Sequence, residues 1–453
     1  MDGAFRRAVA EARRHGDLYF AGLLSQERIL RAFGAARALW QGWVYTPAVT
    51  VWVFLSQCLS SDHSCRESVA RLIAWRLAQG LKPCSAETGA YCTAREDLPE
   101  MTCYRLVQDT GREVEPGIPQ GWLWLGRRVL DVDGSTLTMP DTAANQAEYP
   151  QQPGQAPGCG FPMARILVVF SLAIGTVLEA AISKYQGKRT GENSLFRALH
   201  DTLAEGDVVL ADRYFSGWCD MALLLQRGVD VVVRKHQLRA TDFRRGQRLG
   251  TDDHLVQYVK PARPEWMNRE QYAQLPEALT LREVRIHVTQ KGFRTRRLVV
   301  VTTLLDPEQY PAEEIAALYR QRWQAELNLR SLKIVLQMDH LRCKTPHRVR
   351  NEFYMHLVAY NLIRQMIAVA AFRTGVEPWT VSFKGALQTI TNLLPVLSSR
   401  VSTASWCEAV LQAIATHAVG NRPNRFEPRV KKQRPKQYEF MREPRANYKR
   451  RVA

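Results

Sequence analysis

The sequence predicts a mixed α/β protein, with helical regions at both ends and a β-rich insertion near the middle. Three observations indicate this fold. Residues 1 to about 105 carry apolar side chains at helical spacing, as in Leu23 to Trp43 and Ala48 to Leu59. Short apolar runs then alternate with helical segments between residues 122 and 233, and helical spacing returns from Pro311 onward. Such an alternation is typical of a sheet covered by helices.

Turn signals separate the elements of the alternating region. Trp122 to Asp133 is expected to form a strand that ends at the Asp133-Gly134 pair. Ile166 to Ile182 is long and apolar, but Gly175 lies at its middle, so two buried strands and a tight turn are expected rather than a membrane helix. A helix, a strand, a helix and a strand are then expected at Glu192 to Leu203, Asp207 to Ala211, Gly217 to Gln226 and Val229 to Val233.

Two further segments complete the predicted organisation. The insertion contains β-like runs at Leu281 to Val288 and Arg297 to Thr303, and two long helices follow at Ala312 to Leu336 and Val349 to Phe372. Four regions are predicted. Residues 1–120 form a helical region, and residues 121–234 and 306–372 form an α/β core in two pieces. Residues 235–305 form the β-rich insertion, and residues 373–453 form a helical C-terminal region with a basic tail.

The charge of the chain indicates a polyanionic partner. Sixty-two Lys and Arg against 44 Asp and Glu give a net charge of +18, which suggests nucleic acid or an anionic membrane. Because no membrane helix is expected, nucleic acid is preferred. Residues 421–453 hold 12 Lys or Arg and 3 Asp or Glu. Such a tail either binds phosphate without sequence preference or only aids solubility.

The cysteines and the N-terminus bear on location. The nine cysteines include no Cys-x-x-Cys pair and are irregularly spaced, so neither a zinc site nor a disulfide framework is indicated. The N-terminus lacks the apolar core of a signal peptide. We therefore expect a cytoplasmic protein with reduced thiols.

The strongest functional signal lies between Tyr319 and Lys333. On one helix at about 100° per residue, Tyr319, Arg322, Glu326 and Lys333 fall on a narrow stripe, with Arg330 close by. Apolar residues flank this stripe, on one side Leu318, Ala325, Leu329, Leu332 and Leu336, and on the other Trp323, Leu327 and Ile334. The pattern predicts a helix over a crevice. The alternative is an exposed face with ion pairs such as Arg322 with Glu326.

Two aspartates are expected at strand ends in the same region. Asp133 lies in LDVDGS and Asp212 in VVLADRYF, where carboxylates would point into the crevice at the sheet edge. Asp131 shares the face of Asp133 and is an alternative to it, although such aspartates can also be simple turn formers. With Glu326 they would suit two Mg²⁺ or Mn²⁺ ions, which can activate water or a 3′-OH against a phosphodiester.

These residues resemble the signature of bacterial insertion-sequence DDE transposases of the insertion-sequence-four family. The signature, Tyr, two residues, Arg, three residues, Glu, six residues and Lys, matches Tyr319, Arg322, Glu326 and Lys333 without a mismatch. The first acid of the family is commonly followed by Gly and Ser or Thr, and the second lies in an Asp-Arg context. They match Asp133 and Asp212, and the gap of 113 residues before Glu326 agrees with the family's β-rich insertion.

The resemblance implies a ribonuclease-H-like core with Asp133, Asp212 and Glu326 as catalytic, metal-binding triad. It implies cut-and-paste transposition of an insertion sequence, in which water nicks the element end and the freed 3′-OH closes a hairpin. After hairpin opening, the 3′-OH would attack target DNA. The partners would be double-stranded terminal inverted repeats and target DNA, bound by a homodimer at the nucleoid.

Several side chains are candidates for DNA contact. The resemblance assigns Tyr319, Arg322 and Lys333 to the element end, and Arg330 and Arg213 lie beside the predicted acids. Hairpin formation needs a flipped base held by an aromatic ring. Trp323 and Trp266 are the candidates, although each could instead be a packing residue.

Other functions fit the sequence less well. A tyrosine recombinase is suggested by His347-x-x-Arg350, but Tyr354 and Tyr360 lie too close to serve as its nucleophile and Tyr438 too far. A phosphate-binding loop is excluded, because Gly187-Lys188-Arg189 lacks the required glycine and hydroxyl residue. A catalytically inactive or domesticated transposase that only binds DNA is the remaining alternative.

Overall fold

A computed structural model describes residues 23–287, 297–393, 403–419 and 440–452. Nine strands form one continuous sheet in the order β3-β2-β1-β4-β5-β9-β8-β7-β6. The first five are β1 (Val129–Thr138), β2 (Met163–Ser171), β3 (Val177–Lys184), β4 (Val208–Ala211) and β5 (Asp230–Arg234). β2 is antiparallel to β1 and β3, whereas β4 and β5 are parallel to β1. This is the arrangement of a ribonuclease-H-like core, so the predicted fold class is confirmed.

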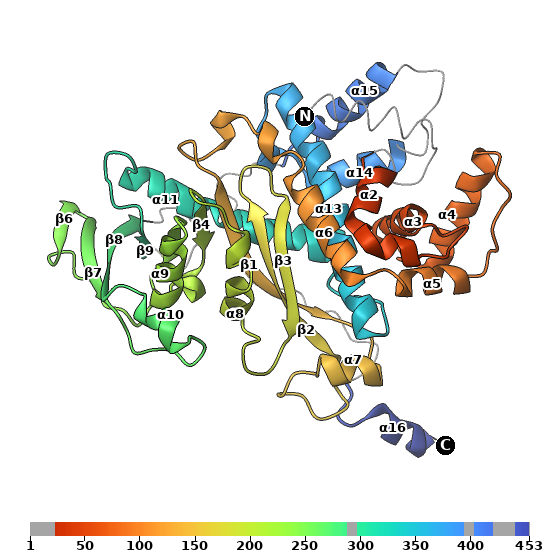
Figure 1. Ribbon diagram of the computed structural model, residues 1–453, viewed down its shortest axis with the longest axis horizontal. Helices are drawn as coiled ribbons and strands as arrows, with labels where there is room; N and C mark the ends of the chain where they lie inside the picture. The colour runs from red at the N-terminus through yellow and green to blue at the C-terminus, as the bar shows by residue number, and fades with distance from the viewer. Residues whose placement is uncertain (1–22, 288–296, 394–402, 420–439, 453) are drawn as a thin grey trace.

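The strands of the insertion extend the same sheet. They are β6 (Gln247–Gly250), β7 (Asp253–Val259), β8 (Ala278–His287) and β9 (Arg297–Thr302). β9 pairs antiparallel with β5, from Val232 opposite Thr302 to Arg234 opposite Val300. In Figure 1, β6, β7 and β8 therefore lie at one end of the molecule, continuous with the central strands.

Helices cover both faces of the core strands. On one face, Leu130 and Val132 of β1 pack with α8 (Glu192–Arg197) and α9 (Trp218–Gln226). On the other, Val129 packs in a cluster that includes α11 (Ala312–Gln321). This alternation follows from the two-residue period of a strand. It places Asp131 and Asp133 on the face of α11, and Gly134 on the face of α8.

The N-terminal helices share a hydrophobic core with the sheet. They are α2 (Gln26–Phe33), α3 (Pro47–Leu59), α4 (Cys65–Ala78), α5 (Gly89–Glu96) and α6 (Glu100–Arg112). Figure 1 shows α2 to α5 at the end of the molecule opposite β6 and β7. One cluster of buried side chains joins these helices to β2, β3 and α13 (Pro346–Thr374). The predicted domain limits stay a prediction, and the described N-terminal helices pack directly against the core.

One buried carboxylate fixes α6 to the sheet. Glu179 of β3 is 1% exposed. It accepts hydrogen bonds from the Tyr104 hydroxyl at 2.6 Å and the Gln108 amide at 2.9 Å, and it forms an ion pair with Arg112. Residues 108–112 are therefore the last turn of a docked helix.

Three expected elements have different limits. The first strand begins at Val129 and continues through Asp133 to Thr138. Residues 120–122, where it was expected to begin, form a 3₁₀ turn. The helix expected from Leu23 to Trp43 is α2 followed by a 3₁₀ turn, and the one expected from Glu192 to Leu203 stops at Arg197. A short 3₁₀ turn therefore follows each of these two helices.

The helix expected from Ala312 to Leu336 is interrupted. It consists of α11, α12 (Trp323–Arg330) and a π-helical turn at Ser331–Val335. A π-turn shifts the side chains that follow it around the helix axis. The angular stripe calculated for a regular helix therefore does not hold as far as Lys333.

The expected hairpin within Ile166 to Ile182 is confirmed as β2 and β3, joined by a turn in which Gly175 has φ of +74°. Among the described residues, one helix, α13, is long and apolar enough to cross a membrane, and 94% of its apolar window is buried inside the protein. Its helical partners at the C-terminal end are α14 (Phe383–Leu393) and α15 (Thr403–Thr416).

The basic tail is described only in part. Residues 421–439 lie outside the described residues. The final helix, α16 (Arg445–Val452), ends in the cations Lys449, Arg450 and Arg451 and lies near α7 (Ala143–Glu148) in Figure 1.

Candidate active site

The sheet pairing places three polar residues in a row. Val132 of β1 pairs with Ala211 of β4, and Ala211 pairs with Val233 of β5. The next residue of each strand is Asp133, Asp212 or Arg234. Because these three strands are parallel, the three side chains lie side by side at one edge, on the face of α11 and α12. The predicted neighbours Asp133 and Asp212 are therefore brought together.

The local backbone holds both aspartates. Asp212 follows β4 directly, and its Oδ1 accepts a hydrogen bond from the Tyr214 N–H at 2.7 Å. Asp133 lies inside β1 rather than at a turn, and its Oδ1 accepts a bond of 2.9 Å from the Gly134 N–H. The expectation that Asp133-Gly134 ends the strand is thus wrong, because Gly134 still pairs with Leu167 of β2.

A buried contact positions Glu326 over these strands. The N–H of Ala325 donates a hydrogen bond of 2.9 Å to Oδ2 of Asp131. Asp131 is fully buried, and in the described part of the chain its Oδ1 has no hydrogen-bond partner. This bond fixes the turn of α12 that carries Glu326 above β1. Asp131 thus holds α12, while Asp133 and Glu326 stay partly exposed.

The acids influence one another. The pKa of Asp133 is raised to about 6, mainly by burial. The carboxylates of Glu326 and Asp212 contribute to this rise, whereas the Gly134 N–H and the Arg322 guanidinium oppose it. Burial also raises the pKa of Asp131 well above its usual range. These mutual effects show that Asp133, Asp212 and Glu326 share one electrostatic environment.

Cations surround the acids. Nη2 of Arg322 donates a hydrogen bond of 2.8 Å to Oε1 of Glu326. Burial raises the pKa of the neighbouring Tyr319 to about 12, although Arg322 and Arg234 oppose this shift. Burial, and then the charges of Arg213 and Arg322, lower the pKa of Arg234. Arg234 was missed in the sequence. Its place after Val233, in register with Asp212, was the signal that could have found it.

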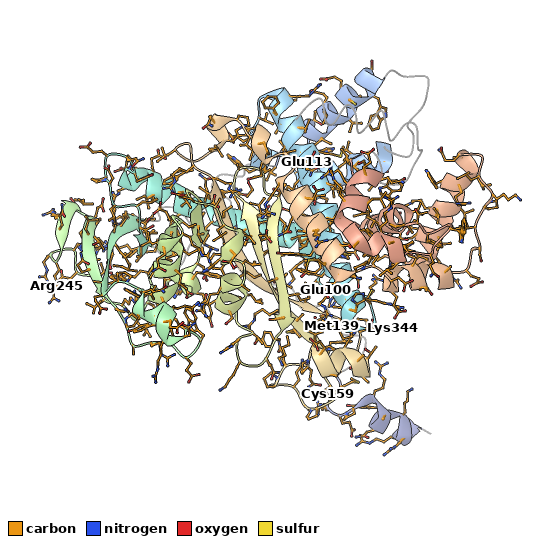
Figure 2. The ribbon with its side chains drawn as sticks, in the orientation of Figure 1. Glu100, Glu113, Met139, Cys159, Arg245 and Lys344 are labelled. Atoms are coloured by element: carbon orange, nitrogen blue, oxygen red, sulfur yellow. The ribbon has the colours of Figure 1, made fainter. Side chains whose placement is uncertain are left out.

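Lys333 also reaches the site, despite the π-turn. Its Nζ donates a hydrogen bond of 3.1 Å to Oγ of Ser135 on β1 and pairs with Asp339 at 2.9 Å. The chain then runs along the end of β1, where Leu341 N–H bonds to the Thr138 carbonyl. Figure 2 accordingly shows Met139, just after β1, near Lys344.

The other predicted DNA contacts differ in accessibility. Arg330 is exposed, and Arg213 donates a hydrogen bond to Gln237 at 2.5 Å. Trp323 is 45% exposed, beside the exposed Leu327 and Ile334. The apolar flank that these three form is therefore open to solvent, contrary to a stripe enclosed on both sides.

Trp266 has a different environment. The Arg197 guanidinium lies 3.7 Å from the centre of its ring, and the ring packs against the core on the α9 face. One face of this indole is therefore covered, and the row of Asp133, Asp212 and Arg234 lies on the other side of the sheet.

The donor set is of the type that hard divalent ions prefer. Aspartate and glutamate oxygens suit Mg²⁺ and Mn²⁺, and the unpartnered Oδ1 of Asp131 adds a buried acceptor. Within the described ranges, no group of three or more His, Cys, Asp or Glu side chains is arranged to hold a metal ion. Glu326 forms an ion pair of 2.8 Å with Arg322, four residues earlier in the chain.

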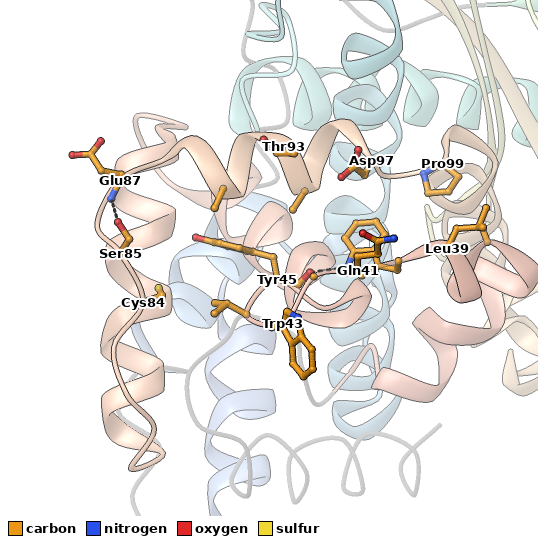
Figure 3. Close-up of a pocket in the computed structure, with 16 residues that line it drawn as sticks. Leu39, Gln41, Trp43, Tyr45, Cys84, Ser85, Glu87, Thr93, Asp97 and Pro99 are labelled. Atoms are coloured by element: carbon orange, nitrogen blue, oxygen red, sulfur yellow. Dashed lines mark hydrogen bonds between the residues drawn. The ribbon is translucent and has the colours of Figure 1, made fainter.

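A separate groove of about 840 Å³ lies among the N-terminal helices (Figure 3). It is lined mainly by the segment after α2 and by α5, with Trp43 and Tyr45 at its walls. None of the predicted site residues contributes to it. The row of Asp133 and Asp212 is therefore the candidate for catalysis.

Comparison with known proteins agrees with this geometry. Residues 124–362 match the family described as the transposase DDE domain, a span that contains Asp133, Asp212 and Glu326. The chain is 27% identical over 404 residues to the transposase InsG of insertion sequence element IS4 from Escherichia coli strain K12, covering 86% of this chain and 85% of that protein. It is 39% identical over 69 residues to an Escherichia coli transposase of element IS421, covering 15% and 19% of the two chains.

A solved structure with a similar chain is the piggyBac transposase synaptic complex with hairpin DNA. The TM-score is 0.43 at 12% identity, and the similarity covers 86% of this chain and 80% of that one.

The fold and the matched family define a polynucleotide-processing enzyme with an acidic site. The chain belongs to the DDE transposase domain family and is an insertion-sequence-four-type transposase, a nuclease and strand transferase. Membership of this family implies a DNA partner and the use of a divalent metal ion.

Proposed function

We propose that this transposase moves an insertion sequence by a cut-and-paste route, with Asp133, Asp212 and Glu326 as its catalytic acids. The reaction would comprise phosphodiester hydrolysis at the element end, closure of a hairpin by the freed 3′-OH, and strand transfer into target DNA. The substrates would be the terminal inverted repeats and the target duplex.

One observation carries this proposal. Asp133 and Asp212 each follow a residue of the same parallel pair, Val132 with Ala211, and the Asp131–Ala325 bond sets Glu326 above them. Three acids from distant parts of the chain therefore meet at one sheet edge. A purely structural role would not require them to stay partly exposed among cations.

The acids would hold two Mg²⁺ or Mn²⁺ ions. Such ions, when bound, activate the attacking oxygen and stabilise the leaving oxygen of a phosphodiester. The protein's own contribution is to hold deprotonated carboxylates in place and to supply cations. Arg322 would release Glu326 as it turns to the phosphate of the DNA, because the phosphate replaces the carboxylate as its partner.

The neighbouring cations and aromatic rings fit a DNA end. Arg322, Arg234 and Arg213 surround Asp212 on the side of Tyr319, and Lys333 lies on the other side, above Ser135. Arg330 would contact the DNA backbone farther out. A base flipped from the helix would stack on Trp323, which is 45% exposed. Trp266, covered by Arg197, is the weaker candidate.

Assembly and location follow from the reaction. Two element ends must be cut in one complex, so we propose a homodimer on DNA. The exposed cations of α16 would add contacts to phosphates that do not depend on sequence. The expected place is the cytoplasm, at the nucleoid.

The test is cleavage of a duplex that carries the element's own terminal repeat, with Mg²⁺ or with EDTA. Wild-type protein is compared with Glu326→Gln and with the control Glu313→Gln, an exposed acid in the first turn of α11. We expect Mg²⁺-dependent nicks that vanish in Glu326→Gln, while end binding and the control stay unchanged. Equal cleavage by Glu326→Gln and the wild type would reject the triad.

The same assay decides the alternative function. An inactive or domesticated transposase would bind the terminal repeat in Mg²⁺ and in EDTA alike and would cut in neither. In that case the acids would be remnants of an earlier activity.

A further inference from the structure

A fourth acid lies against β1 on the face opposite Glu326. Glu192 begins α8, and its carboxyl group occupies the space beside Gly134. A Cβ atom at residue 134 would lie 2.4 Å from Cδ and 2.6 Å from Oε1 of Glu192. Gly134 does not have a positive φ, so a glycine is needed here for this close approach and not for a turn.

The Glu192 carboxylate packs against Gly134 but takes part in no ion pair among the described residues. In the part of the chain that the structure describes, no hydrogen bond or ion pair reaches it. The side chain is half-buried, and the charged groups that affect it are Arg165 and Asp212. A half-buried carboxylate without a bonded partner is costly unless another ligand meets it.

The position of Glu192 relates it to the row of acids. Gly134 follows Asp133 directly, and Asp212 is close enough for its charge to influence Glu192. Glu192 and Glu326 thus approach the same point of β1 from its two faces. Glu326 comes from α12 and Glu192 from α8.

We propose that Glu192 is a fourth carboxylate of the divalent-metal site, which it approaches past Gly134 from the face of the sheet opposite Glu326. This inference rests on the proposed function, because it assumes that the row of acids binds metal. It explains why residue 134 is a glycine, which the catalytic triad alone does not explain.

The test measures Mn²⁺ binding by the full-length protein without DNA, from the electron paramagnetic resonance signal of free Mn²⁺. The variants are Glu192→Gln, Glu192→Asp, Asp133→Asn and the matched control Glu148→Gln, an exposed acid on α7. We expect Glu192→Gln to weaken Mn²⁺ binding by about 10- to 100-fold. Glu192→Asp should lose less of its affinity for Mn²⁺, because it keeps the negative charge. The control should bind Mn²⁺ as the wild type does.

Thermal unfolding separates a metal role from a structural one. Without metal, Glu192→Gln should unfold at the wild-type temperature, and added Mn²⁺ should raise that temperature less than in the wild type. An equal loss of stability with and without Mn²⁺, at unchanged affinity, would make Glu192 a structural residue.

The outcomes also distinguish this inference from the proposed function. If Asp133→Asn loses Mn²⁺ and Glu192→Gln binds it normally, Glu192 is not a ligand but the triad stands. If the wild-type protein does not bind Mn²⁺, both proposals fail.

Discussion

Arg322 donates a hydrogen bond to Glu326 over 2.8 Å, one helical turn away. The same guanidinium lowers the pKa values of Asp131 and Asp133 against the effect of their burial. Arg322 is therefore the counter-ion of the whole group of acids, and in a DNA complex it would have to exchange them for a phosphate.

Removal of this counter-ion should move the pH dependence of cleavage. Arg322→Ala leaves Asp133 with a pKa above its present value of about 6. Because the acid must be deprotonated to bind metal, the acid limb of the rate profile should shift upward by about one pH unit. The profile is measured with Mg²⁺ and a pre-nicked substrate. Arg320→Ala, an exposed residue of α11, is the control, and an unmoved limb in Arg322→Ala would contradict the counter-ion role.

Arg234 should act on the substrate and not on the metal. Arg234→Ala removes a cation in register with Asp212. The rate of cleavage should therefore fall by about 10- to 100-fold, which is the effect of losing one electrostatic contact to a transition state. Mn²⁺ affinity should stay unchanged. The matched control is Arg227→Ala, which precedes β5 at the opposite edge of the sheet. A parallel loss of Mn²⁺ binding would show that Arg234 only supports the fold.

We expect two buried histidines to lower the stability of the protein in mild acid. Burial lowers the pKa of His200 from 6.5 to about 4 and that of His356 to about 3. Between pH 6.5 and these values the unfolded chain binds more protons than the folded one. The free energy of unfolding should therefore fall as pH is lowered through this window, by about 1.4 kcal/mol per unit and per histidine.

The measurement is urea unfolding at several pH values between 4 and 7. His200→Gln should reduce the slope of stability against pH by about one proton. His340→Gln changes a side chain that is 80% exposed and should leave the slope as it is. A wild-type slope in His200→Gln would show that other groups cause the loss.

Glu179 should be a main support of the N-terminal helices. Glu179→Ala leaves Arg112, Tyr104 and Gln108 without their shared acceptor. A buried donor that loses its acceptor costs roughly 1–3 kcal/mol of unfolding free energy, whereas the Arg112 side chain, 38% exposed, can turn to solvent. Urea unfolding at pH 7 measures this value. Glu265→Ala, an exposed acid before α10 (Arg269–Ala273), should change it by less than about 0.5 kcal/mol. A similarly small change in Glu179→Ala would contradict the role.

The sequence was sufficient for the topology of the core. The two-residue and 3.6-residue periods are produced by burial on one face, so they located β2, β3, β4, β5, α9 and α13 closely. The expected strand end at Asp133-Gly134 was wrong, because Gly134 was interpreted as a turn residue. Its actual cause is the approach of Glu192, which lies 58 residues farther along the chain. A contact of that kind leaves no local signal.

The candidate site was predicted in part for a similar reason. The spacing from Tyr319 to Lys333 marked one helix, but a regular helix could not show the π-turn at Ser331–Val335. Arg234 was missed because its meaning depends on strand register, which pairs Val233 with Ala211. The roles of Asp133, Asp212 and Glu326 stay predictions until the cleavage assay.

The unbroken sheet has a consequence for the position of the insertion relative to the acids. Adjacent strands are about 4.8 Å apart, so β8 lies roughly 14 Å from β4 across β5 and β9. Backbone hydrogen bonds between neighbouring strands therefore fix the distance from β8 to the strand that Asp212 follows. Longer loops in the insertion would leave this distance unchanged, whereas the gain or loss of a whole strand would change it.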